Sequence, residues 1–318
     1  MDNLRGINSE LISAFKRSSL YNLVKENPKE IVTCIRNNYI GLYHNADRIA
    51  KVTSKRNGEL QCTINSYYLS DYHINQSNRK AGKEEIHSPE YIYQHFDKIK
   101  KNSAIRSTPE KKAQQTLVSL NNTNPNSEWI CIDIEYKQSL NVQDKISEKV
   151  KGRFDIIAIS KTKPHRIAII ELKFNDRSLS GNSGIVNHLK DFHRFNNKKC
   201  IYNLKKEIQV QLLNLSELDL LIDPPCINDI EKEFCRDIEF YIICLYDTME
   251  SPRGKVGGYL FNKKHSEWGT KRVSTKNAEK EIPEEFNILN SVKFLFRRVS
   301  SPTEIDIKEI LNLENYEP

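Results

Sequence analysis

Apolar residues along the first third of the chain change from helical to alternating spacing. Helical spacing predicts a helix over 8–26. Two aromatic and β-branched runs follow, 37–53 and 58–70, and they are separated by a turn that contains Asn57-Gly58. Asn-Gly between two such runs is a strong hairpin signal. The beginning of the chain is therefore predicted to be a helix followed by a β-hairpin.

Further along the chain, a short helix is expected over 89–100, and Ser107-Thr108-Pro109-Glu110 has the residues of a helix N-terminus. The remaining predicted elements are a helix to about residue 120, strands over 129–138, 153–160 and 166–174, helices over 184–196 and 201–222, and strands over 238–246 and 292–300. This order predicts a mixed α/β core, in which a sheet is flanked by helices. We expect an N-terminal α+β region over 1–105 and a second domain over 106–318.

Composition favours a folded chain outside the membrane. The 318 residues have a mean hydropathy of -0.63, but 14 Tyr and 12 Phe supply packing that disordered chains lack. No apolar run approaches the roughly 20 residues that span a bilayer, and the N-terminus lacks the pattern of a signal peptide. A cytoplasmic location is therefore expected. The seven cysteines contain no C-x-x-C pair, so we expect reduced core residues rather than a zinc site.

Three charged residues interrupt two runs that otherwise have the composition of buried strands. Asp155 lies in the first run, and Glu171 and Lys173 lie in the second. Alternation along a strand places Glu171 and Lys173 on one face. If the two runs form a hairpin with its turn centred near residue 163, Asp155 and Glu171 are equally far from the turn. A symmetric hairpin would bring the two carboxylates side by side.

Two adjacent buried carboxylates repel each other unless a cation neutralises them. Mg²⁺ favours one or two carboxylates together with water and substrate phosphate, and Mn²⁺ is the alternative ion. A lysine beside such an ion can orient water and offset charge on a reacting phosphate. The pattern of Asp155, Glu171 and Lys173 therefore predicts a site that cleaves phosphodiesters.

The same three residues resemble the motif of the PD-(D/E)xK nuclease superfamily, which has the restriction-endonuclease-like fold. Asp155 matches the first acid, Glu171 the second and Lys173 the lysine, and the resemblance covers about residues 107–246. It implies a mixed sheet flanked by helices and a metal held by Asp155, Glu171 and the backbone carbonyl of Leu172. The chain departs from the pattern where Phe154, not Pro, precedes the first acid. The following helix also lacks the Gln-x-x-x-Tyr of the exonuclease branch.

Many members of this superfamily add an acid, for which the chain offers Glu110 or Glu135. Glu135 is slightly favoured, because Asp133 and Glu135 share a face of an otherwise apolar strand. The alternative role for Glu110 is only that of a favourable charge at a helix start. His188 follows the Gly-rich stretch after the second strand. One hypothesis places it near the metal or the scissile phosphate, and the alternative is a purely structural role.

The net charge of +7 is compatible with a polyanionic partner. Basic residues recur along one side of the predicted helix over 184–196 and in the stretch 251–276, where aromatic residues are interleaved. A solvated surface is the alternative for both segments. The candidate residues for nucleic-acid contact are Lys190, Arg194, Lys198, Lys263, Lys264, Lys271 and Arg272.

The leading hypothesis from the sequence is a metal-dependent nuclease that hydrolyses DNA by water attack. The alternatives are an RNA-cleaving nuclease and a catalytically inactive nuclease-fold protein with a binding or assembly role. A homodimer or a protein partner is a further hypothesis for the N-terminal region over 1–105. Mobile-element defence and repair are the biological roles that suit such a chain.

Overall fold

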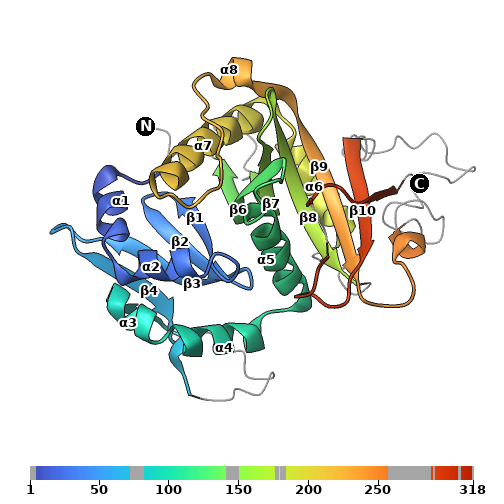
Figure 1. Ribbon diagram of the computed structural model, residues 1–318. Helices are drawn as coiled ribbons and strands as arrows, with labels where there is room; N and C mark the ends of the chain where they lie inside the picture. The colour runs from blue at the N-terminus through green and yellow to red at the C-terminus, as the bar shows by residue number, and fades with distance from the viewer. Residues whose placement is uncertain are drawn as a thin grey trace, which may run out of the picture.

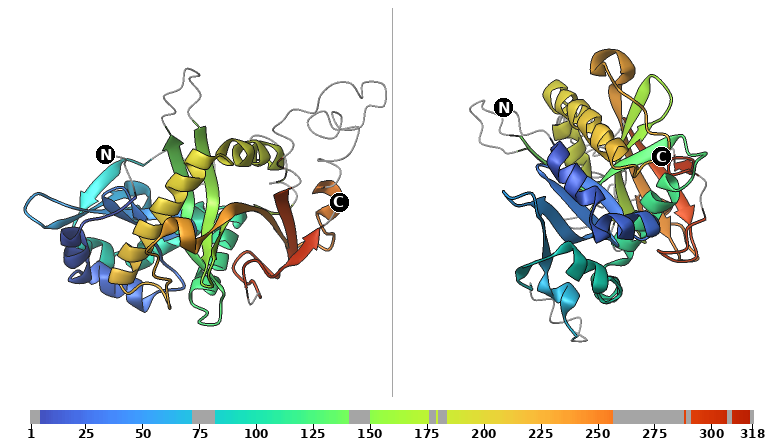
Figure 2. Two further views of the ribbon diagram at one scale, coloured as in Figure 1. Left: turned by 90° about the horizontal axis from the view of Figure 1, so that it is seen from above. Right: turned by 60° about the vertical axis from the view of Figure 1, so that its left-hand side comes forward.

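The computed structural model describes residues 5–71, 82–140, 150–175, 179, 184–256, 288, 291–306 and 309–316. The chain is a mixed α/β protein with two β-sheets, one of five strands and one of six, together with helices (Figure 1). Figures 1 and 2 show the N-terminal elements at one end of the molecule and β10 and β11 at the other. The predicted class is therefore confirmed at the level of mixed α/β.

The five-stranded sheet belongs to the N-terminal part of the chain, and its neighbouring strands are all antiparallel. Its strands follow chain order: β1 (Val32–Arg36), β2 (Tyr39–His44), β3 (Asp47–Ser54), β4 (Leu60–Asn65) and β5 (Glu84–His87). The helices around it are α1 (Ser9–Lys16), α2 (Ser19–Glu26), the 3-10 helix η1 (Ser66–Leu69), α3 (Pro89–Gln94) and α4 (Phe96–Arg106). The predicted hairpin at Asn57-Gly58 is confirmed by the pairing of β3 with β4 and by the φ of +80° at Gly58.

Two predictions for this region are wrong in detail. The single helix over 8–26 is two helices, because the hydroxyl of Ser18 caps α2 by accepting from Tyr21 N. The run 37–53 is two strands rather than one, because Asn45 and Ala46 both have positive φ and turn the chain between β2 and β3. Strands β1 and β5 were not predicted.

The six-stranded sheet has the order β11-β10-β9-β8-β7-β6. Its strands are β6 (Trp129–Leu140), β7 (Val150–Ser160), β8 (His165–Phe174), β9 (Phe234–Tyr246), β10 (Val292–Arg298) and β11 (Glu314–Tyr316). Strands β6, β7 and β8 form an antiparallel meander, and β9 then lies parallel to β8. The predicted order of helix, three strands, helix and strand is confirmed, whereas β11 was not predicted.

Helices cover both faces of the six-stranded sheet. Figure 1 shows α5 (Pro109–Asn122) and α6 (Ile185–Phe195) on opposite sides of the strands. Leu117 of α5 packs in one buried cluster with Ile170 of β8, and Leu189 of α6 packs in the other with Ile169. Helix α7 (Lys198–Glu217) joins the α6 side, and the short α8 (Ile230–Glu233) precedes β9. Strand β8 is therefore central and buried on both faces, as parallel-paired central strands usually are.

The two sheets share buried side chains. Val32 and Tyr43 of the N-terminal sheet belong to the cluster beneath α5, and Leu215 of α7 belongs to the N-terminal core. The proposed division between 1–105 and 106–318 stays a prediction. All seven cysteines are free, and five of them are buried. Over the described ranges, no helix is long and apolar enough to cross a membrane.

Candidate active site

The hairpin of β7 and β8 brings Asp155 next to Glu171. The strands pair Ile156 with Ile170 and Ile159 with Ile167, so the register is symmetric about residue 163, as predicted. Continued by one residue, this register sets Asp155 opposite Glu171. The ladder itself stops there, and Asp155 Oδ2 instead accepts a hydrogen bond of 2.8 Å from Leu172 N. The carboxylate of Asp155 is thus fixed against the strand that carries the other two charges.

Side chains of β6 and β7 change faces at the position of Asp155. Ile134 and its partner Ile156 lie in the cluster beneath α5, but the next partners, Tyr136 and Phe154, lie in the cluster beneath α6. The backbone of Glu135 has a φ of +54°, a left-handed conformation that is uncommon for residues other than glycine. Such departures occur preferentially at functional sites. Simple alternation along a strand does not predict this irregularity.

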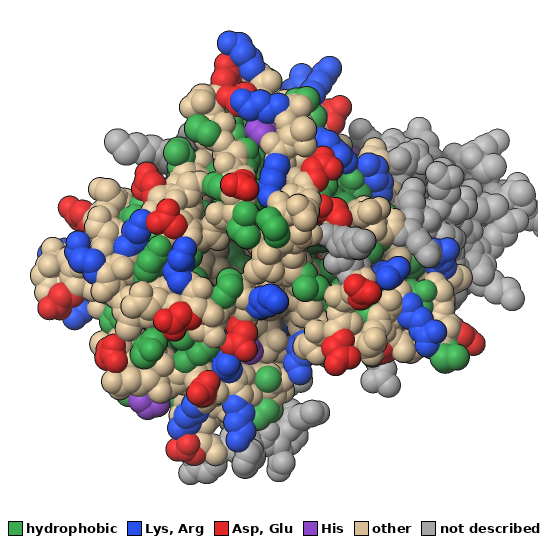
Figure 3. All heavy atoms as spheres, viewed as in Figure 1, with side chains coloured by type: hydrophobic (Ala, Val, Ile, Leu, Met, Phe, Trp, Pro, Cys, Tyr) green, Lys and Arg blue, Asp and Glu red, His purple; other side chains and the backbone are tan. Residues whose placement is uncertain are grey.

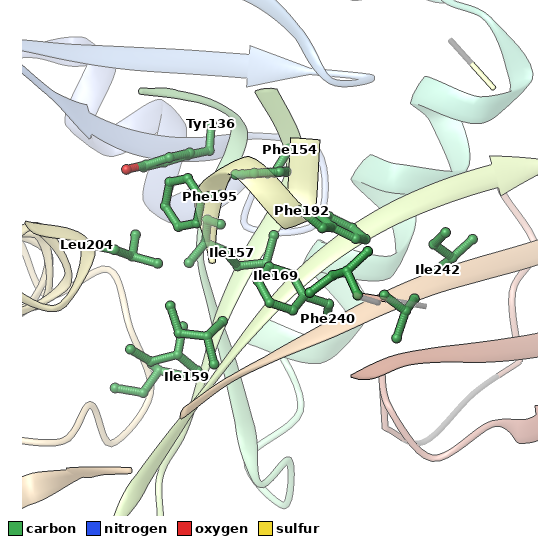
Figure 4. Packing of buried hydrophobic residues seen from close by; sticks show 14 of the residues in the cluster. Tyr136, Phe154, Ile157, Ile159, Ile169, Phe192, Phe195, Leu204, Phe240 and Ile242 are labelled. Carbon is green, nitrogen blue, oxygen red and sulfur yellow. The ribbon is translucent and has the colours of Figure 1, made fainter. Parts of the chain in front are cut away.

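An aromatic cluster fixes this end of β7 to α6. The ring of Phe154 lies 5.0 Å from that of Phe195 and 6.3 Å from that of Tyr136, measured between centroids. Phe192 packs on Phe240 of β9 at 4.9 Å. Figure 4 shows these rings gathered between α6 and the sheet. Because Phe154 directly precedes Asp155, this packing sets where the carboxylate lies relative to α6.

Glu171 and Lys173 form a buried ion pair at the end of the central strand. Their exposed fractions are 2% and 1%, and Lys173 Nζ lies 2.8 Å from Glu171 Oε1. His188, from the first turns of α6, places Nε2 2.8 Å from Glu171 Oε1 and 3.4 Å from Lys173 Nζ. The structure therefore brings Asp155, Glu171, Lys173 and His188 together.

Burial and like charge shift the ionisation of this group. Burial and then the charge of Glu171 raise the pKa of Asp155 well above its usual range. Burial likewise raises the pKa of Glu171 to about 7, against the opposing charge of Lys173. Burial alone would lower the pKa of Lys173, but the carboxylates of Glu171 and Glu110 outweigh it and raise that pKa. Lys173 is thus an ammonium at neutral pH. Burial favours proton binding by the two acids, and a nearby cation would oppose it.

Of the two candidates for the additional acid, the structure brings Glu110 into contact with the site. Glu110 Oε1 lies 3.9 Å from Lys173 Nζ. Gln114, one turn later on α5, donates a hydrogen bond of 2.5 Å to the backbone oxygen of Asp155. Glu135 instead forms an ion pair with Arg153 at 2.5 Å, although its charge also raises the pKa of Asp155. The preference for Glu135 is therefore not supported by the contacts.

Two arginines from the N-terminal part hold the irregular segment of β6. Arg5 and Arg36 both bind the carboxylate of Asp133, which is fully buried. They also donate to the backbone oxygens on either side of Glu135, Arg36 to Ile134 at 2.6 Å and Arg5 to Lys137. Asp133 and Glu135 therefore have separate partners, and they do not form the shared acidic face expected from the sequence.

The carboxylate and carbonyl oxygens of the site are suitable ligands for a hard divalent cation. Glu110 Oε2 and Glu171 Oε2 are buried and have no hydrogen-bond partner among the described residues. The N–H and C=O of one strand residue point to the same side, so the Leu172 carbonyl faces the same strand edge as the N–H bound by Asp155. Within the described ranges, no group of three or more His, Cys, Asp or Glu side chains is placed to hold a metal ion. Mg²⁺ does not need one, since one or two carboxylates with water suffice.

The predicted nucleic-acid residues fall into two sets. Lys190 and Arg194 lie on α6 and Lys198 begins α7; the side chain of Arg194 is 51% exposed and lies 3.7 Å from Asp191. Lys263, Lys264, Lys271 and Arg272 lie outside the described residues. In the view of Figure 3, Lys and Arg side chains are interspersed with Asp and Glu over the described part of the surface. Nucleic-acid contact by Lys190, Arg194 and Lys198 therefore stays a prediction.

Comparisons of the chain with protein-family models, with curated proteins and with solved structures give no match.

Sequence reasoning missed the residues that support the three central charges. Gln114 has a detectable signal, because it follows Glu110 by four residues and both therefore lie on one side of the helix. Arg5 and Arg36 have none, since their contacts with Asp133 span 128 and 97 residues.

Proposed function

We propose that the chain is a metal-dependent nuclease that hydrolyses phosphodiester bonds in DNA, built on a restriction-endonuclease-like core. The observation that carries the proposal is the buried Glu171–Lys173 pair beside Asp155, with all three at the end of the β7–β8 hairpin. The meander of β6 to β8, the parallel β9 and the helices on both faces support the same core. A purely structural ion pair would not need the second carboxylate next to it, because that carboxylate adds repulsion.

The residues that would hold the ion are Asp155, Glu171 and the carbonyl of Leu172, with Glu110 within reach. Bound Mg²⁺ or Mn²⁺ would supply a Lewis acid and a coordinated water of lowered pKa. Asp155 is fixed by its hydrogen bond to Leu172, and Glu171 is fixed by Lys173 and His188. These contacts keep both carboxylates oriented before any ion arrives.

Lys173 has an electrostatic role in this proposal. Its pKa is raised, so it donates hydrogen bonds and does not accept a proton at neutral pH. Its ammonium, held by Glu171, would orient the attacking water and stabilise negative charge that develops on the phosphate. His188 touches both residues and is assigned to positioning them. Burial of Lys173 keeps competing water away and strengthens the interaction.

The test is cleavage by the purified chain. Plasmid, linear duplex DNA, single-stranded DNA and RNA are each incubated with Mg²⁺, Mn²⁺ or EDTA. We expect metal-dependent cutting of DNA, which Glu171→Gln abolishes and the exposed control Glu231→Gln retains. Cutting in EDTA, or equal cutting by Glu171→Gln, would contradict the proposal. Cutting of RNA alone would replace DNA as the substrate.

A further inference from the structure

Strands β6 and β7 present two positive charges directly opposite each other next to the candidate active site. Lys137 and Arg153 are register partners, and both residues are exposed. Like charges at directly opposed strand positions are destabilising. The carboxylate of Glu135 contacts only Arg153 of this pair in the described structure. Arg153 is two residues from Asp155, so this pair of cations lies beside the proposed cutting site.

The positive charges continue from this pair onto the N-terminal sheet. Lys111 follows Glu110 in the first turn of α5, and its Nζ lies 2.5 Å from Asp47 Oδ1 at the start of β3. Arg48 is the next residue of β3, and its guanidinium lies 3.1 Å from the carboxylate of Glu84 on β5, where both side chains are exposed. Partial burial lowers the pKa of Lys137, and the charges of Arg153, Lys111 and Arg48 lower it further, whereas the charge of Glu135 opposes them. The four cations are therefore close enough to interact.

An aromatic ring lies among the cations at the far end. The guanidinium carbon of Arg48 is 6.0 Å from the ring centre of Tyr39, and Lys51 Nζ is 4.9 Å from it. Arg48 is exposed, and Tyr39 and Lys51 are partly exposed. Cations beside an aromatic ring are typical of surfaces that follow a nucleic-acid backbone. We call this set the basic strip; it consists of Lys137, Arg153, Lys111, Arg48, Lys51 and Tyr39.

We infer that the phosphate backbone of the DNA runs from the cutting site along the basic strip, so that the N-terminal sheet forms part of the substrate-binding surface. This inference rests on the proposed function and adds a DNA path to it. Phosphates placed along the strip would offset the repulsion between the opposed Lys137 and Arg153, which Glu135 offsets only in part. The strip contains no residue of α6 or of the stretch 251–276, the two segments that the sequence suggests.

The test compares the salt dependence of DNA binding by two triple variants. One replaces Arg48, Lys51 and Lys137 by Gln. The control replaces the exposed residues Lys199, Lys232 and Arg236 by Gln, so that both variants lose the same net charge. Binding of a short fluorescent duplex is measured in EDTA over a range of salt, and melting temperature checks the fold. We expect the strip variant to flatten the slope of log K against log salt by about 3, while the control keeps the parental slope.

An unchanged slope in the strip variant would overturn the inference. If the parent protein still cuts DNA with Mg²⁺ in that case, only the path along the strip is wrong. A parent that neither binds nor cuts DNA would remove the proposed function as well. Equal flattening in both variants would show a general charge effect and would also contradict the strip. Binding of RNA of the same length, without binding of DNA, would contradict DNA as the partner.

Discussion

Replacing Asp155 by Asn should stabilise the protein when no divalent ion is present. Burial raises the pKa of Glu171 from 4.5 to about 7, which corresponds to about 3 kcal/mol at pH values above both and sets the scale for a carboxylate buried in this site. Burial and then the charge of Glu171 shift the pKa of Asp155 in the same direction. The shift of Glu171 destabilises the folded protein, because the folded state binds the proton of this carboxyl more tightly than the unfolded state does. Stability therefore falls as pH rises from 4.5 through 7. At pH 8 the whole cost is present. Asn keeps an oxygen that can accept from Leu172 N and removes one of the repelling charges.

We therefore expect Asp155→Asn to raise the free energy of unfolding by about 1–3 kcal/mol at pH 8 in EDTA. The gain should shrink toward pH 5, where the acids of the wild-type site retain their protons. Urea unfolding at both pH values measures it, with the exposed Asp237→Asn as the matched control. In Mg²⁺ the wild type should recover stability through binding, and the variant should recover less. Loss of stability by Asp155→Asn at pH 8 in EDTA would refute the electrostatic account of the site.

Two further predictions concern the fold around the site. Burial lowers the pKa of His44 to about 4, so the free energy of unfolding should fall by up to about 3 kcal/mol as pH drops from 6.5 to 4. In urea titrations, His44→Asn should flatten this pH dependence. Parallel curves of stability against pH for the two proteins would contradict the prediction. Arg36→Met leaves the buried Asp133 with Arg5 alone and should cost about 3–5 kcal/mol, whereas the exposed Arg48→Met should cost less than about 1 kcal/mol. Similar losses in the two arginine variants would show that Asp133 does not depend on its second arginine.

The parts of the site that follow from local rules were predictable, and those that follow from long-range packing were not. The turn between β7 and β8 is short, so the symmetric register that sets Asp155 opposite Glu171 could be counted from it. The preference for Glu135 over Glu110 assumed unbroken alternation along β6, and the contacts around the site do not support it. The left-handed backbone of Glu135 breaks this alternation there.

The same distinction applies to the N-terminal part of the chain. Gly58 marks a hairpin that sequence reveals, because glycine adopts positive φ readily. Asn45 and Ala46 form a comparable turn, but nothing in an Asn-Ala pair marks it, since alanine rarely adopts positive φ. Strand β1 was missed for another reason. Its burial depends on packing beneath α5, which lies far away in sequence.

The central claim is that Lys173 takes part in chemistry, and a single-turnover cleavage rate tests it most directly. Wild type and Lys173→Met are compared on the same DNA in saturating Mg²⁺, with binding and melting temperature measured in the same buffer. If the ammonium orients water and stabilises the reacting phosphate, the rate should fall by a factor on the order of 10² or more. DNA affinity and melting in this buffer should change little, because bound Mg²⁺ would still neutralise Glu171 and Asp155. A Lys173→Met variant that stays folded, binds DNA and cuts it at the wild-type rate would contradict the account.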